Sequence, residues 1–480
     1  MATAPNTTAA QPGGEQEVTT KSRPRLSFGS RFGYGLGDLA CVLLFSGLSG
    51  FLALFYTDAV GISAGVVGVI ILLARVVDGI FDAVIGAVAE RTRSRFGRFR
   101  PWILFGAVPL AVFAVLTFTA PFPGTSPEAV IWAIITYGIL GLLDSCVNVP
   151  YAALSGVMAE TPADRLSMNS MRFALSSIGL VLTGAITLPL ISVFGPPSGE
   201  NASPVGYTIT AGIFAIIGVI LCIVTFLTSR ETVMPVRTEL PRVKETLRAV
   251  FQNGPLFVIG LLTILAGVAF YSRLGVVVYY YIYNANAAAL AAVLIPLSPV
   301  AALVGSLLFS RFATRIGKRN LFIIGSALQA IALVALYFTD ATNIAWVAVF
   351  TVIHGLAGFN IPLTYSMVAD AADYGEHKSG TRSDGVSFAV VSVAQKLAFA
   401  VAGVSVALLG VFGYQANVAQ TPETLQGINF VVNLFPAIVA VVSIMAALLY
   451  RLTDAKAASI RTELNVQTAA TRVVPDKSSN

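Results

Sequence analysis

Long apolar runs constrain the fold of this chain of 480 residues more than any other feature. An α-helix needs about 20 mainly apolar residues to cross the hydrocarbon core of a bilayer. Runs of that length stand between polar, proline or glycine breaks over residues 31–57, 62–89, 101–120, 129–155, 168–194, 207–229, 253–284, 287–309, 320–338, 344–369, 385–412 and 427–451. These runs predict an all-α membrane protein with twelve transmembrane helices.

The composition excludes several other classes of protein. Hydrophobic residues make up 56% of the chain, and charged residues only 11%, against roughly 25% in a soluble domain. A water-soluble fold could not cover that much apolar surface with charge, which excludes a soluble enzyme and a disordered protein. The basic residues stand in short runs between apolar segments, so we expect a lipid bilayer as partner and no nucleic acid. The three cysteines lie inside apolar segments and are interpreted as packing residues.

The positions of the basic residues predict the orientation of the chain. Four of the 30 Lys and Arg residues lie within the predicted spans, namely Arg75, Arg172, Arg273 and Lys396. The others stand in the tails and in the loops on one side of the membrane, and the loops on the other side hold none. Because cytoplasmic loops carry an excess of Lys and Arg, both termini are predicted to be cytoplasmic. We therefore expect a multi-pass protein of the cell inner membrane.

Two short patterns occur once in each half of the chain. Residues 95–98 read Arg-Phe-Gly-Arg and residues 315–318 read Arg-Ile-Gly-Lys, while residues 148–150 and 360–362 read Asn-Val-Pro and Asn-Ile-Pro. Two parallel repeats of six helices are the plan of the major facilitator fold. The expected organisation is a disordered cytoplasmic tail (1–27), a six-helix bundle (28–229), a cytoplasmic connector (230–252), a second six-helix bundle (253–452) and a cytoplasmic tail (453–480). We expect a monomer.

Ionisable residues inside the spans indicate where function resides. They are Asp38, Arg75, Asp78, Asp82, Asp144, Arg172, Arg273 and Lys396. Each costs several kcal/mol at membrane depth unless it is paired or wetted, which makes each a candidate for function. At about 1.5 Å per helical residue, Asp78, Asp82, Asp144 and Lys396 lie at similar depths. We therefore expect a central polar cavity in which charges from separate helices meet.

Asp78 and Asp82 are four residues apart and share one face of their helix. Two carboxylates that approach each other at low dielectric either share a proton or hold a cation between them, and cation coupling needs such a site. The alternative is that both acids only pair with Arg172 and Lys396 to hold the bundle together. Asp144 and Asn148 have the same spacing.

Several segments stand in the order and at the spacing of one known family. They are Tyr34-Gly35-Leu36-Gly37-Asp38, Ala74-Arg75-Val76-Val77-Asp78 with Asp82, the loop from Arg91 to Trp102, Asn148-Val149-Pro150-Tyr151, the loop from Ala369 to Glu376, and Gln395-Lys396. In these segments the chain resembles the glycoside–pentoside–hexuronide:cation symporters, from about residue 28 to residue 452. The resemblance implies secondary active transport of a sugar or glycoside together with H⁺ or Na⁺, with no other cofactor.

The resemblance also implies roles for single residues. Asp78 and Asp82 match the family's cation-site acids, and Ser145 stands where its sodium users present a hydroxyl. The family's sugar-pocket or charge-network residues correspond to Asp38, Arg172, Lys396 and the preceding Gln395. By their position, Asp144 and Asn148 face the same pocket.

The chain departs from the family pattern at several of these positions. Phe81 replaces an asparagine next to the second cation-site acid, which removes an oxygen ligand and favours H⁺ over Na⁺. Asn148 replaces a sugar-binding aspartate, and Ala152 and Ile361 replace tryptophans. The galactoside pocket of the family's best-known members is therefore not reproduced, and the solute is left open. A lipid-like or other non-sugar cargo on the same fold is the alternative, and no catalytic constellation indicates a membrane enzyme.

Two further hypotheses concern residues outside the cation site. Arg273 could join Arg172 and Lys396 to make the cavity positive, which favours an anionic sugar such as a hexuronide. If Arg273 instead pairs with Asp38 or reaches the outer interface, a neutral sugar is the default.

The second hypothesis concerns the inner helix ends. Charges of both signs stand there at Glu90, Arg98, Arg319, Asp370 and Asp373, and we expect them to form ion pairs that close the inner face. Ring faces beside polar neighbours, as at Tyr279, Tyr280, Tyr281 and Tyr283, suit sugars, but tyrosine is also common at the membrane interface, and we favour the interface interpretation.

Overall fold

The structure is a computed structural model that describes residues 27–159, 162–199, 202–231, 253–309, 312–379 and 384–473. The predicted disordered tail (1–27) and the predicted connector (230–252) fall almost entirely outside the described residues. All regular secondary structure in the described ranges is helical. Twelve helical segments are long and apolar enough to cross a membrane, which confirms the predicted fold class.

The first half of the chain contributes six spans. They are α1 to η2 (Phe28–Val60, which includes η1, Val42–Ser46, and α2, Gly47–Leu54), α3 (Ala64–Arg91), α4 (Arg100–Thr117), α5 (Pro127–Met158), α6 (Pro162–Phe194) and α7 (Pro204–Thr228). Ser126 and Ser203 cap α5 and α7 with their side chains, and a proline follows each cap at the first helical position. That proline has no N–H to leave unpaired, so it suits a helix start.

The second half contributes six more spans, several of them interrupted. They are α9 (Gly254–Leu274) with α10 (Val277–Tyr279) and η3 (Tyr280–Asn284), η4 (Ala288–Leu290) with α11 (Ala291–Phe309), α13 (Lys318–Phe338), α14 (Ile344–Leu356) with η5 (Ala357–Phe359) and α15 (Asn360–Ser379), α16 (Asp384–Ala402) with α17 (Val404–Val411), and α18 (Pro422–Asn429) with η6 (Phe430–Leu434) and α19 (Phe435–Leu448). The short helix α12 (Ala313–Ile316) precedes α13.

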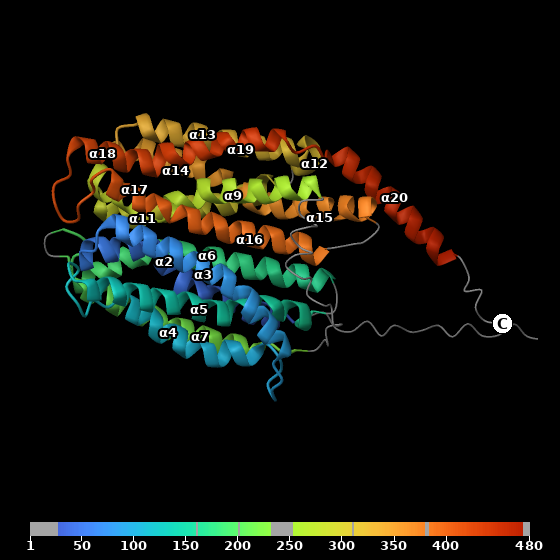
Figure 1. Cartoon of the computed structure of the whole chain (residues 1–480), viewed down its shortest axis with the longest axis horizontal. Coiled ribbons are helices and arrows are strands. Elements are labelled where there is room, and N and C mark those ends of the chain that lie inside the picture. Colours follow the sequence, from blue (N-terminus) through green and yellow to red (C-terminus); the bar gives the residue numbers. More distant parts are fainter. Residues whose placement is uncertain are drawn as a thin grey trace, which may run out of the picture.

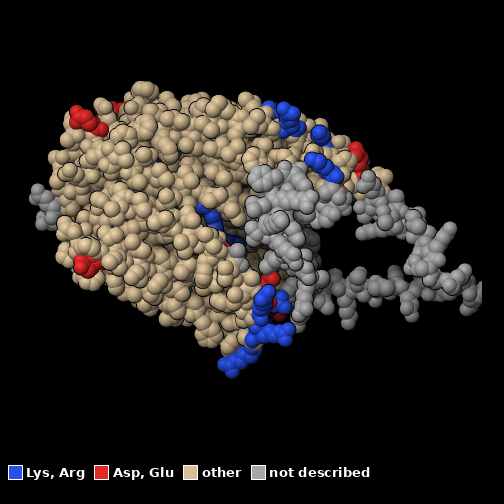
Figure 2. All heavy atoms as spheres, viewed as in Figure 1, with Lys and Arg blue, Asp and Glu red and all other residues tan. Residues whose placement is uncertain are grey.

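The two halves form bundles that lie side by side (Figure 1). Helix α3 of the first bundle packs against α16 and α17 of the second, and α6 packs against α11. Large apolar side chains remain exposed along the outer faces of the spans, for example Ile80, Phe105 and Phe338. Figure 2 shows this uncharged surface around the middle of the molecule and most of the visible Lys and Arg at one end. We call that end, which includes residues 91–100, 315–319 and the last helix, the basic end.

Two symmetry-related turns close the bundles at the basic end. Gly97 and Gly317 both have positive φ angles, of 106° and 87°, a conformation that favours glycine. The Glu231 carboxylate accepts hydrogen bonds from the backbone N–H groups of Arg98 at 2.8 Å and of Phe99 at 2.8 Å. In the other half, the Asp454 carboxylate accepts a hydrogen bond from the N–H of Lys318 at 2.9 Å. Each acid thus binds the free N–H groups at the start of the third helix of its bundle.

The predicted second tail contains a helix, α20 (Asp454–Val473), at the basic end (Figure 1). Ala457 and Ile460 are buried, and Arg461 donates to Asp373 at 2.9 Å and to Asp370 at 3.4 Å. The apolar positions of α20 thus cover part of α15, a contact that the pattern of apolar runs does not predict.

Candidate functional site

A cavity of about 410 Å³ lies between the two bundles and contains most of the predicted site residues. Its charged lining residues are Arg75, Asp78, Asp82, Asp144, Arg172 and Lys396. Ser145, Asn148 and Gln395 line it too, so charges from α3, α5, α6 and α16 do meet at one place. Figure 2 shows basic side-chain atoms in a hollow between the bundles.

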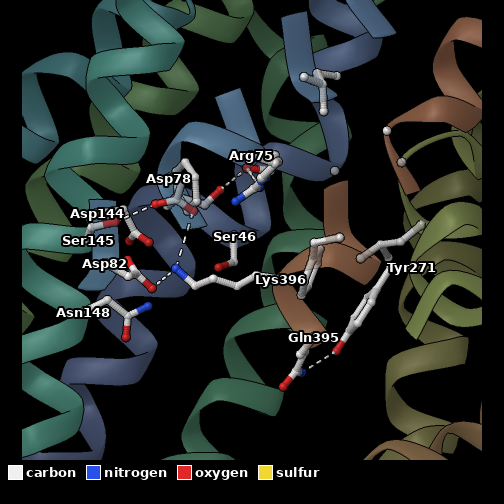
Figure 3. Close-up of a pocket in the computed structure, with 18 of the residues that line it drawn as sticks. Ser46, Arg75, Asp78, Asp82, Asp144, Ser145, Asn148, Tyr271, Gln395 and Lys396 are labelled. Atoms are coloured by element: carbon white, nitrogen blue, oxygen red, sulfur yellow. Dashed lines mark hydrogen bonds and ion pairs between the residues drawn. The ribbon is translucent and has the colours of Figure 1, made fainter. Parts of the chain in front are cut away.

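Lys396 joins the two halves of the molecule inside this cavity. Its ammonium group forms an ion pair with Asp82 and lies 3.8 Å from Asp78 Oδ2. Figure 3 shows the lysine side chain extended from α16 toward the two acids on α3. The other Asp78 oxygen accepts a hydrogen bond from Ser145 Oγ at 2.5 Å. Both acids therefore pair with Lys396 of the other bundle, as the alternative interpretation predicts, whereas Arg172 pairs with Asp38 instead. Binding of a coupling ion by the two acids stays a prediction.

Asp38 and Arg172 form a second charge pair beside the cavity. Arg172 Nε donates to Asp38 Oδ1 at 3.0 Å, and the guanidinium carbon lies 5.1 Å from the centre of the Tyr151 ring. Asp38 is 7% exposed and lies behind Arg172, which lines the cavity. The pair links α1 to α6 within the first bundle.

Asp144 differs from the other cavity acids in its surroundings. It is 7% exposed, and its Oδ1 has no hydrogen-bond partner among the described residues. It points into the same region as Asp78, Asp82 and Asn148 (Figure 3). An acceptor that lies buried without a donor costs free energy, so this oxygen is available for a proton, an ion or a substrate hydroxyl.

Several residues that line the cavity are not assigned by the sequence patterns. Arg75 donates to Ser49 Oγ at 3.3 Å, and its guanidinium carbon lies 4.5 Å from the centre of the Phe45 ring. Tyr365 donates to Gln395 Oε1 at 2.5 Å, and Gln395 Nε2 donates to the Tyr271 hydroxyl at 3.2 Å.

The sequence marks only one of these residues as a candidate for function. Arg75 is recognisable as an ionisable residue inside a span. Tyr271 and Tyr365 are not recognisable, because a single tyrosine in an apolar helix resembles any packing residue.

Arg273 does not line the cavity, which corrects its assignment to the substrate site. It is 3% exposed on the other side of α9, where its guanidinium donates to Thr351 Oγ1 on α14 at 3.2 Å. Its neighbours Tyr271 and Leu274 do line the cavity. Adjacent side chains on a helix, and side chains two residues apart, point in different directions. The depth of Arg273 in the membrane therefore could not show whether Arg273 or one of its neighbours faces the cavity.

The charges predicted for the inner gate lie at the basic end. Asp370 pairs with Lys318 at 2.5 Å and with Arg461, and Asp373 pairs with Arg461. Glu90 is exposed, Arg98 is bound through its backbone N–H, and Arg319 is partly buried. The three ion pairs all lie within the second half, so closure between the halves by these charges stays a prediction.

The halves do contact each other at the opposite end. Asp58, which is 2% exposed, accepts hydrogen bonds from Tyr283 at 2.5 Å, from Tyr414 at 2.8 Å and from Thr57 at 2.6 Å. Thr57 also shares a hydrogen bond of 2.8 Å with Tyr279. We call these five residues the outer tyrosine cluster.

The burial of Tyr279, Tyr280 and Tyr281 corrects their interpretation as residues of the membrane interface. All three are fully buried, because they pack inside the fold. Tyr414 lies in the loop after α17, where burial and the Asp58 charge raise its pKa. It therefore keeps the proton that it donates to Asp58 at any physiological pH.

The sequence and fold have relatives among known proteins. The family model described as MFS/sugar transport protein matches residues 33–454. The isoprimeverose transporter of Lactiplantibacillus pentosus is 33% identical over 441 residues, which cover 91% of each chain. The glucuronide carrier protein homolog of Escherichia coli (strain K12) is 29% identical, over 92% of this chain and 96% of that protein.

A solved D-xylose-proton symporter structure has a similar fold, with a TM-score of 0.63 at 17% identity over 88% of this chain and 97% of that one. The family match covers both bundles, and the sequence relatives cover nearly the whole chain. This chain therefore belongs to the MFS/sugar transport protein family, among the glycoside–pentoside–hexuronide:cation symporters of the major facilitator superfamily.

Proposed function

We propose that this protein is a secondary active transporter that moves a neutral sugar or glycoside together with one monovalent cation by alternating access. The observation that carries the proposal is the ion pair of Lys396 with Asp78 and Asp82 across the two bundles. Without a coupling ion, the single ammonium charge is shared between the two acids and leaves one negative charge uncompensated. A coupling ion at the acids replaces the ammonium group and frees Lys396 to bind the solute, so ion binding changes the contacts between the bundles.

The charges around the cavity support one cation for each neutral solute. Asp38, Asp78, Asp82 and Asp144 contribute four negative charges, and Arg75, Arg172 and Lys396 contribute three positive ones. One monovalent cation therefore makes the site neutral. Neutrality matters because a net charge at membrane depth is expensive to move between the two sides.

The lining also favours a sugar over a lipid-like cargo. The site presents carboxylates, an amide and hydroxyls that can exchange hydrogen bonds with a polyol, together with ring faces of Tyr271, Phe399 and Tyr137. Aromatic faces beside polar groups suit the apolar faces of sugar rings. A lipid tail would leave the charged groups unsatisfied.

H⁺ is the coupling ion that we propose. Phe81 removes a possible oxygen ligand next to Asp82, and Asp144 Oδ1 offers a buried acceptor beside Asp78. The relatives support the same class of function, since one is named a transporter of isoprimeverose and another a glucuronide carrier homolog. We assign the protein to the inner membrane with both termini cytoplasmic, so the basic end is the cytoplasmic end and the outer tyrosine cluster closes the outer side.

Uptake into proteoliposomes tests this function. A panel of glycosides, pentosides and hexuronides is offered under an imposed proton gradient, an imposed sodium gradient or neither. Accumulation of a neutral glycoside above equilibrium under the proton gradient, abolished by a protonophore, is expected. Uptake that requires sodium and ignores the protonophore would reverse the choice of ion.

An anionic glycoside is the second candidate, and one observation favours it. Arg75 lines the cavity, and no described carboxylate lies within ion-pair distance of its guanidinium. A uronide carboxylate could bind there in bidentate fashion. In that case a uronide binds more tightly than the matching neutral glycoside, and Arg75→Gln removes the difference.

A further inference from the structure

Arg273 is a buried charge that the transport cavity does not use. It lies on α9, is 3% exposed, and its guanidinium faces α14 rather than the cavity. A cation removed from water inside a membrane protein is strongly unfavourable unless another group compensates its charge. The structure must therefore provide a partner for it.

No described carboxylate lies within ion-pair distance of Arg273. Its guanidinium donates to the Thr351 hydroxyl at 3.2 Å, and Thr351 in turn lies 3.5 Å from the Tyr281 hydroxyl. Asp340 is the acid of the neighbouring loop, but it is exposed and accepts hydrogen bonds from Thr342. Hydroxyl groups satisfy single hydrogen bonds, yet they leave the positive charge uncompensated.

Several polar atoms around Arg273 are also buried without a partner among the described residues. They include Arg273 Nε itself, His354 Nδ1 and the Tyr280 hydroxyl. His354 is 2% exposed, follows Thr351 by one helical turn, and stacks on Phe270 with ring centres 5.6 Å apart. The Tyr280 ring packs edge-on against Tyr281 at 5.9 Å between ring centres, and the Tyr281 hydroxyl lies 3.5 Å from Thr351, so Tyr280 and His354 both lie beside the hydrogen-bond partner of Arg273. Buried polar atoms without a partner indicate an ion or a water molecule that completes their hydrogen bonds.

We infer that Arg273, Thr351, His354 and Tyr280 form a binding site for a small monovalent anion of the chloride type, buried in the second bundle. Guanidinium, imidazole and phenol can all donate a hydrogen bond to one anion. A single positive charge is matched by a single negative charge, whereas sulfate or phosphate would leave an excess. The solute itself is excluded as the ligand because this cluster does not line the cavity.

Thermal unfolding of the purified full-length protein tests the site. Chloride is compared with gluconate at equal ionic strength, because gluconate is too large for a buried site between packed helices. Chloride well above its dissociation constant should raise the unfolding temperature by on the order of 2 °C, since a ligand that binds only the folded state stabilises it. Arg273→Gln should lose this difference, and Arg451→Gln, a change at an exposed arginine, should keep it.

Bromide provides a direct reading that does not depend on any variant. Crystals of the wild-type protein grown or soaked in bromide should show an anomalous peak within about 3.5 Å of the Arg273 guanidinium, at hydrogen-bond range for a large anion. The inference is overturned by equal stability in chloride and gluconate, by a chloride effect that persists in Arg273→Gln, or by bromide density elsewhere only. Both experiments measure anion binding and not solute uptake. Their outcome is therefore independent of whether the proposed transport function is correct.

Discussion

The two bundles share their turns at the basic end but differ in the chemistry at membrane depth. Gly97 with Glu231 and Gly317 with Asp454 make the same arrangement in each half, a left-handed glycine beside a carboxylate that binds backbone N–H groups. By contrast, the four acids around the cavity all come from the first bundle, and Lys396 comes from the second.

The repeated Asn-x-Pro pattern shows the same division. Asn148 lines the cavity, whereas Asn360 is 2% exposed and donates to the Ser326 hydroxyl at 3.0 Å and to the Phe322 carbonyl. The same motif thus contributes to the cavity in the first half and to helix packing in the second. Equivalent positions of the two bundles can therefore be compared by mutation.

The largest expected effect comes from the acids of the first bundle. Asp78→Asn or Asp82→Asn should abolish accumulation above equilibrium, because the one remaining acid cannot compensate both Lys396 and a coupling ion. Downhill exchange of solute should survive. The matched change in the second bundle is Ser298→Ala, 220 residues after Asp78, and it should leave accumulation intact. Uptake by proteoliposomes measures both, and wild-type accumulation in either acid variant would contradict the cation-site assignment.

The two glycine turns should differ in how much stability they contribute. An added Cβ would lie 2.6 Å from the Glu231 carboxylate in Gly97→Ala and 2.7 Å from Asp454 in Gly317→Ala, and both φ angles are positive. Each change should destabilise the protein by about 1–3 kcal/mol. Gly97→Ala should cost more, since Glu231 binds three successive N–H groups there. Thermal unfolding with Gly212→Ala as the control, where an added Cβ meets open space, measures this, and equal losses would show that the carboxylates contribute little.

The two asparagines of the repeat should separate binding from stability. Asn360→Ala removes two buried hydrogen bonds and should lower stability by about 1–3 kcal/mol without changing solute affinity. Asn148→Ala should weaken solute binding several-fold while the unfolding temperature stays near that of the wild type. Binding and unfolding are measured on the same purified samples. A loss of stability in Asn148→Ala as large as in Asn360→Ala would mean that the two positions are structurally equivalent after all.

The smallest effect is expected at the outer tyrosine cluster. Tyr414→Phe removes one of three hydroxyl donors to Asp58 and should weaken outer closure by about 0.5–1.5 kcal/mol. A cysteine placed at Ser49 in the cavity, in a chain without its native cysteines, should then react faster with an impermeant reagent added from outside. The labelling rate itself rises with pH, because the cysteine thiolate is the nucleophile. Because the raised pKa keeps Tyr414 protonated, the ratio of the rates with Phe and with Tyr at position 414 should stay constant between pH 6 and 9, below the ordinary tyrosine pKa of about 10. A ratio that falls toward one as the pH rises over this range would contradict the role of the tyrosine proton.

The sequence by itself determined the twelve spans, the two-bundle plan and most of the charged residues that meet in the cavity. Run length and hydrophobicity are local properties that the bilayer turns directly into helices, and ionisable groups at membrane depth must find partners. For that reason Asp78, Asp82 and Lys396 can be grouped from their positions along the chain alone.

Only the tertiary structure decided which groups pair with the ionisable residues and which side chains face the cavity. Arg273 has the depth of a cavity residue, but the rotation of α9 directs it to Thr351 instead. Tyr279 and Tyr283 resemble interface residues in the sequence, yet Tyr279 bonds to Thr57 and Tyr283 donates to Asp58, both in the other half. Helix rotation and the packing of distant segments depend on the whole set of contacts, and no local pattern in the chain records them.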